Sequence, residues 1–316
     1  MRRQAGIDVL RGFAAVGIIG CHLGLQPNTE AAKLLLRFTD FNVGLFGVIA
    51  GWFLFSSLTF EEFDAREIIL RKTKRLLTPY FCWSALYIIA SPIFNLLCRK
   101  PLINPKFYDW CYWFKIVFAG QAALHLWFLI HLFYCTVALA ILYMNGFKLK
   151  PVLTYCLSVA LIIISGLCGG NEFTYYAVRL YSFVFLGGAL YLSKDLFEIT
   201  HPRMWAILSI ILSIMHISCR IGSRFWHDWL LSIPVFLFFH SLKLPNNYFS
   251  RFCADHSFSV YLIHPLICAG IAVVAQKIFA TPYSATATLC VWIVDTFLAV
   301  IASCVLKIVS KLYYAK

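Results

Sequence analysis

The chain has 316 residues, of which 61% are hydrophobic and 13% are charged, and its mean hydropathy is +0.79. A soluble globular domain carries about 25% charged residues, so this composition excludes a soluble enzyme and predicts an all-α, polytopic transmembrane helix bundle. The net charge of +13 does not indicate nucleic-acid binding, because the basic residues flank apolar segments instead of forming a solvated face.

Apolar stretches of about 20 residues predict ten membrane spans. They lie at residues 7–25, 41–59, 76–97, 126–145, 151–168, 174–192, 203–219, 226–242, 255–278 and 284–308. Residues 107–118 are aromatic but too short to cross, so we expect them at the headgroup level. Lys and Arg are more frequent in the segments that lie on the side of the termini, which predicts that both termini are cytoplasmic. We expect one membrane domain over residues 1–316, with no appended soluble domain.

The first span carries three ionisable residues, Asp8, Arg11 and His22. Such groups are expensive inside a membrane and are therefore candidates for function. Arg11 and His22 are eleven residues apart, so in a helix they face the same way, roughly 16 Å apart along the axis. The alternative is that Arg11 reaches the headgroups and His22 lies at the opposite end for structural reasons.

A dense basic cluster, Arg71 to Arg75, precedes the third span. It is either a topology anchor or a phosphate clamp, since arginine binds phosphate bidentately. We take Arg71, Lys74 and Arg75 as candidates for binding a phosphorylated cytoplasmic ligand. Glycines in the second and sixth spans (Gly44, Gly47, Gly51, Gly187 and Gly188) are expected to allow close helix packing.

The later spans hold further candidates. Arg179 lies inside the sixth span, and His125 and Trp127 lie near the outer end of the fourth. Trp127 is either an aromatic belt residue at the membrane interface or a platform on which a sugar ring stacks. His264 precedes Pro265, which frees a backbone carbonyl about one turn back. Asp295 is a further intramembrane acid, for which a structural pairing and a catalytic task are equally open.

Most of the cysteines lie inside apolar runs and are expected to be buried thiols that form no disulfides. The spacing of cysteine and histidine does not suggest a metal site, and we expect no bound metal.

Taken in order, these segments resemble acyltransferase family 3, the integral-membrane O-acyltransferases that decorate bacterial surface glycans. The resemblance is carried by DVLRG with a histidine eleven residues after the arginine, GLFGVIAGWFLF, RKTKRLLTPYFCW, HLWFL, RLYSFVFLGGALY and FSVYLIHPL. One departure is that this chain has Ala50-Gly51 where the family often has Ser-Gly.

The resemblance implies a bacterial inner-membrane enzyme that moves an acyl group, most often acetyl, from cytoplasmic acyl-CoA to a hydroxyl of a glycan or a lipid-linked oligosaccharide. It implies Arg11 and His22 as the essential pair, and Arg71 and Arg75 on the donor. Histidine suits the role of base, because its ordinary pKa of about 6.5 lies near neutral pH. Asp8, at i−3, would orient Arg11.

The leading rival interpretation is a transporter or flippase in which Arg11, Arg179 and Asp295 line a substrate path. Transporters of that kind often show repeated halves with paired broken helices, and no internal repeat is visible in this sequence. The acceptor sugar, the acyl chain length and the oligomeric state are not determined by the sequence.

Overall fold

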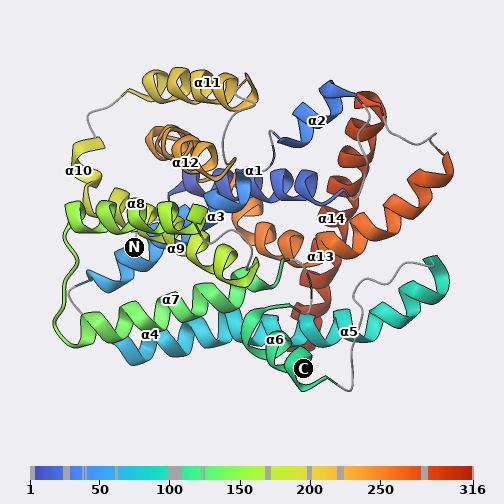
Figure 1. Ribbon diagram of the computed structural model, residues 1–316, viewed down its shortest axis with the longest axis horizontal. Coiled ribbons are helices and arrows are strands. Elements are labelled where there is room, and N and C mark those ends of the chain that lie inside the picture. The colour runs from blue at the N-terminus through green and yellow to red at the C-terminus, as the bar shows by residue number, and fades with distance from the viewer. Residues whose placement is uncertain are drawn as a thin grey trace. The chain divides into compact units, whose positions relative to one another are not determined.

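The computed structural model describes residues 4–23, 29–37, 39, 41–60, 63–98, 109–121, 123, 125–167, 172–197, 201–218, 224–278 and 284–314. The chain forms two compact units, and Figure 1 shows the helices of which they consist. The first unit comprises Met1–Phe46 and Phe197–Lys316, and the second comprises Gly47–Leu196. The predicted all-α class is confirmed, because every regular element of the described residues is a helix.

A helix lies at each of the ten predicted spans. In chain order these helices are α1 (Ala5–Cys21), α3 (Asn42–Leu58), α5 (Thr78–Cys98), α7 (Trp127–Met144), α8 (Pro151–Leu167), α9 (Glu172–Leu192), α11 (Pro202–Ser218), α12 (Arg224–Ser241), α13 (Tyr248–Ile278) and α14 (Ala285–Tyr314). Four helical stretches of the described residues are long and apolar enough to cross a membrane: Ala65–Ile93, Trp127–Met144, Tyr248–Ala275 and Ala285–Ile308. Shorter apolar helices accompany them at Asn42–Leu58, Pro151–Leu167, Pro202–Met215 and Asp228–Ser241.

The apolar surface of α11 has the character of a lipid-facing helix. Ile207, Ile210 and Ile214 recur at helical spacing and are 58–59% exposed. Large aliphatic side chains in such a row are unfavourable in water and favourable against lipid tails. The exposed apolar faces therefore agree with a membrane protein.

The helix boundaries differ from the predicted spans in several places. Helix α1 ends at Cys21, and residues 24 and 25 of the predicted first span lie outside the described residues. The third span begins earlier, because α4 (Ala65–Lys72), the π-helix η1 (Thr73–Leu77) and α5 follow one another without a break. Helix α13 likewise starts at Tyr248, seven residues before the predicted span at 255.

Short helices occupy several of the predicted loops: α2 (Glu30–Arg37), α6 (Trp110–Ala119) and α10 (Lys194–Phe197). Helix α6 covers most of the predicted interfacial segment and extends one residue beyond it, while residues 107 and 108 of that segment are not described. Its start is set by Asp109, whose carboxylate accepts a hydrogen bond from the backbone N–H of Cys111 at 2.9 Å. Trp110 and Phe114 are strongly exposed, as expected of an interfacial helix.

In the first unit, α1 packs against α12, α13 and α14. Two glycines of α1 make this approach close: a Cβ on Gly6 would lie 1.9 Å from the carbonyl oxygen of Phe239, and one on Gly12 would lie 2.7 Å from the sulfur of Cys253. Farther along α1, Ala15 and Ile19 join an apolar core with Val260 of α13 and Val291 of α14. Small residues thus bring backbones together where no water is available to drive association.

In the second unit, the predicted glycine contacts join α3 and α9. A Cβ on Gly51 would lie 2.0 Å from the carbonyl oxygen of Val184, and one on Gly187 would lie 2.0 Å from that of Val48. Gly47 and Gly188 similarly meet Phe183 and Phe55. The packing interpretation of these four glycines is confirmed.

The expectation of buried thiols holds only in part. Cys135 and Cys268 are buried, but Cys82, Cys156 and Cys290 are exposed on their helices. An apolar run of residues cannot show which face of a helix meets lipid and which meets protein, because both faces are apolar in a membrane protein.

Candidate functional site

Asp8 and Arg11 lie together on α1. A carboxylate oxygen of Asp8 is 3.8 Å from a guanidinium nitrogen of Arg11, and the Asp8 side chain is almost fully buried. This is the i,i+3 neighbour relation that the spacing predicts. A buried carboxylate beside a partly buried arginine restrains the guanidinium.

His22 is the C-cap residue that follows α1. Its backbone N–H donates to the carbonyl of Ile19 at 3.0 Å, and its φ of −119° leaves the helical region. Because His22 lies just beyond the last helical turn, its imidazole does not follow the side-chain positions of α1. The ring instead meets His264 of α13, at a centroid separation of 5.1 Å and an interplanar angle of 35°.

The structure thus brings together two of the predicted site residues, His22 and His264, that are 242 positions apart in the chain. His264 is fully buried, and its Nδ1 lies 2.7 Å from the carbonyl oxygen of Tyr261. Two imidazoles in contact at the end of α1 form a group that can accept and hold a proton.

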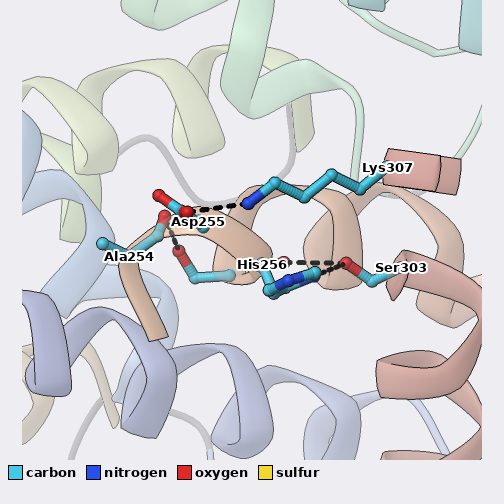
Figure 2. A network of polar contacts seen from close by, with 6 residues as sticks. Ala254, Asp255, His256, Ser303 and Lys307 are labelled. Carbon is cyan, nitrogen blue, oxygen red and sulfur yellow. Dashed lines mark hydrogen bonds and ion pairs between the residues drawn. The ribbon is translucent and has the colours of Figure 1, made fainter. Parts of the chain in front are cut away.

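Two polar contacts at neighbouring positions join helices α13 and α14. Lys307 pairs with Asp255 at 2.7 Å, and His256 Nδ1 lies 2.9 Å from Ser303 Oγ (Figure 2). As the residue number rises on α13 it falls on α14, so the two helices are antiparallel. This register places Asp295 beside Cys268.

Asp295 and Cys268 are both buried. Cys268 follows His264 by four residues, so the two lie on the same face of α13. The buried acid at 295 therefore belongs to the same region as the histidine pair. Its pairing was left open by the sequence, because a contact between α13 and α14 has no signature within either segment.

The basic cluster lies on a helical surface and not in a loop. Arg71, Lys74 and Arg75 are all exposed, and Arg71 Nε is 3.5 Å from Glu67 Oε1. Residues at i, i+3 and i+4 lie within about one turn of each other, so the three cations can contact one ligand.

The π turn at Thr73–Leu77 has a local cause. Pro79 has no N–H to donate to the carbonyl one turn back and its ring crowds that carbonyl, so the helix widens before it. The backbone N–H of Thr78 accordingly donates to the carbonyl of Thr73, five residues earlier. Single π turns are frequent at functional sites.

Trp127 and Arg179 belong to one aromatic group between α7 and α9. The Trp127 ring stacks on Tyr176 at 5.1 Å, and Arg179 NH1 lies 3.5 Å from the hydroxyl of Tyr175. One face of Trp127 is therefore covered by a tyrosine of the same unit. The two tyrosines were missed by sequence reasoning, although their position one turn before Arg179 on α9 would have indicated them.

His125 and His131 are both buried in the second unit. His125 packs edge-on against Tyr87 at 5.4 Å, and His131 Nδ1 lies 3.3 Å from the hydroxyl of Tyr181. The turn that carries His125 is held by Gly120, whose φ of +73° favours glycine and whose added Cβ would lie 2.2 Å from Trp127 Cα.

The described residues contain no group of three or more His, Cys, Asp and Glu side chains that could hold a metal ion. The chemistry that the described site can perform is proton transfer by imidazole and binding of anionic or polar groups by arginine.

Buried histidines and a paired arginine in apolar helices are typical of functional sites in membrane proteins. The family comparison makes this specific: residues 4–308 match the model of an acyltransferase domain, and the chain belongs to acyltransferase family 3. No curated protein and no solved structure matches the chain. The protein is a membrane acyltransferase, and the family match favours this over the transporter interpretation.

Proposed function

We propose that the protein transfers an acyl group, most often acetyl, from cytoplasmic acyl-CoA to a hydroxyl of a glycan or lipid-linked oligosaccharide at the outer face of a bacterial inner membrane. The observation that carries this proposal is the contact of His22 with His264, at the opposite end of α1 from the Asp8–Arg11 pair, in a chain of this family.

His22 acts as the general base. The acceptor oxygen attacks the thioester carbon while its proton moves to His22, and the carbon–sulfur bond breaks with the electron pair leaving on sulfur. The CoA thiolate finally takes up the proton. General-base catalysis of this kind contributes roughly 10²–10⁴-fold to the rate.

Arg11 contacts the donor and Asp8 orients its guanidinium. The two ends of α1 are separated by roughly 16 Å at 1.5 Å per residue, so Arg11 does not act on the atoms that His22 deprotonates. The exposed cations Arg71, Lys74 and Arg75 bind the phosphates of CoA. Trp127 and Arg179 are the candidates for acceptor binding, with Trp127 already braced by Tyr176.

The experiment is a transfer assay with [¹⁴C]acetyl-CoA and membrane vesicles from cells that express the protein and carry its natural acceptor. His22→Ala should lower the turnover by more than about 100-fold, and mass spectrometry should show the loss of acetyl groups from surface glycans. His201→Ala, which changes an exposed histidine before α11, serves as the control. Full activity of His22→Ala would contradict the base assignment, and vesicles with wild-type protein that transfer no acyl group would contradict the function.

A further inference from the structure

In the dipeptide His264-Pro265, the histidine side chain replaces a helical hydrogen bond that the proline removes. Pro265 lies inside α13 and has no N–H, so the carbonyl of Tyr261, four residues earlier, loses its helical donor. His264 supplies the missing donor through its side chain, since its Nδ1 lies 2.7 Å from that carbonyl oxygen. The histidine directly before the proline thus satisfies the carbonyl that the proline leaves without a backbone donor.

This contact fixes the tautomer of His264. A carbonyl oxygen can only accept, so Nδ1 must carry the proton, and in a neutral imidazole the lone pair is then on Nε2. Full burial of the ring keeps it from rotating freely to another arrangement. The α13 backbone therefore determines which nitrogen of His264 is basic.

Helix packing places this ring against His22. Gly12 of α1 approaches Cys253 of α13, and His22, ten residues farther on α1, meets His264, eleven residues farther on α13. The two helices thus run parallel, and close contact at Gly12 sets the register. The centroids of the two imidazole rings are 5.1 Å apart, so the rings are in direct contact.

We propose that His264 is a positioning residue for acyl transfer, and that Pro265 holds it in the tautomer that this task requires. The His264 ring packs against the His22 ring and directs the basic nitrogen of His22 toward the acceptor hydroxyl. When that nitrogen takes the hydroxyl proton, the positive charge on His22 is stabilised by the Nε2 lone pair. The proton then leaves for the CoA thiolate, so the pair returns to its starting state. This inference rests on the proposed function.

The arrangement follows the general logic of a base that is oriented by a third group. Here the orienting group is itself neutral, which suits a buried site because no second charge has to be placed at membrane depth. A purely structural His264 would need only its Nδ1 contact with the Tyr261 carbonyl. The proposal differs because the Nε2 lone pair also stabilises the positive charge on His22.

Two variants separate these roles. Pro265→Ala restores an N–H that competes for the Tyr261 carbonyl, so it should raise the thermal midpoint of the protein while lowering its turnover by about 10-fold or more, because the tautomer is no longer fixed. His264→Asn keeps a donor near the Nδ1 position and removes the Nε2 lone pair. It should fold normally and lose about 100-fold in turnover with an unchanged KM for acetyl-CoA. Pro234→Ala, in α12, is the matched control for removing an intrahelical proline.

The readout independent of activity is the ¹⁵N spectrum of the full-length protein labelled at histidine, with the His264 signals assigned by their loss in His264→Asn. The wild type should show a protonated Nδ1 and a lone pair on Nε2, and Pro265→Ala should show a mixture of tautomers. A protonated Nε2 in the wild type, or wild-type turnover in either variant, overturns the proposal. If the wild type transfers no acyl group, the proposed function fails, whereas the ¹⁵N result still decides the tautomer.

Discussion

At the scale of single residues, the ionisable groups of α1 differ in how they are satisfied. Asp8 and Arg11 neutralise each other on one helix turn, whereas His22 depends on a ring from another helix. The first arrangement could be predicted from the sequence because i,i+3 spacing is local. The second could not, since it depends on the packing of α13 against α1.

The Asp8–Arg11 pair should contribute measurably to stability. Asp8→Asn leaves a partly buried guanidinium without its counter-charge, and we expect a loss of about 1–3 kcal/mol. Asp8→Asn combined with Arg11→Gln should recover part of that loss. Thermal unfolding of the detergent-solubilised protein measures both. The exposed Asp255–Lys307 pair provides the comparison, because Asp255→Asn should cost less than about 1 kcal/mol. Strictly additive single-variant effects at positions 8 and 11 would exclude the pairing.

At the scale of helices, the third span shows what hydropathy can and cannot predict. The apolar window locates α5, but the polar residues of α4 hide the fact that the helix begins at Ala65. Asp64 marks this beginning, since its side chain accepts from the N–H of Arg66 at 2.8 Å. Arg71, Lys74 and Arg75 therefore lie on a continuous helix, which favours a defined ligand-binding face.

The basic face should act on the donor and not on the chemical step. Arg71→Ala together with Arg75→Ala removes two cations within one turn, so the apparent KM for acetyl-CoA should rise about 10-fold or more while the turnover at saturation changes little. Initial rates at varied acetyl-CoA concentration provide the measurement. Lys148→Ala with Lys150→Ala removes two exposed cations from the α7–α8 connection and should leave KM unchanged. Equal effects of the two double variants would reduce the cluster to a topology anchor.

At the scale of the whole molecule, the all-α class and the positions of the ten helices could be predicted because a membrane imposes a length and an apolar composition on each helix. The glycine contacts of α3 with α9 were likewise predictable from small-residue spacing. The region formed by His22, His264, Cys268 and Asp295 was not, because its members come from three helices and share no local pattern. Tyr175 and Tyr176 could have been found from their position one turn before Arg179, but they were overlooked among the many aromatic residues of the chain.

The orientation in the membrane is a separate prediction. The Lys and Arg distribution places both termini in the cytoplasm, so a fluorescent-protein fusion at either end should be fluorescent in cells and an alkaline phosphatase fusion at either end should be inactive. A phosphatase fusion at the α6–α7 connection, at Gln121, should be active. Active phosphatase at both termini would invert the topology and exchange the compartments of Arg11 and His22.

The close contacts of Gly6 and Gly12 on α1 also bear on biosynthesis. Helix α1 leaves the ribosome first, yet its partners on α12 and α13 follow more than 200 residues later. At 5–20 residues per second, α1 waits on the order of 10–50 s for them. During that time its Asp8 and Arg11 must be tolerated beside lipid or an insertion factor. The helix that precedes the proposed base is thus synthesised first but packs against its partners among the last. Errors in assembly should therefore appear as newly made protein that is inserted in the membrane but inactive.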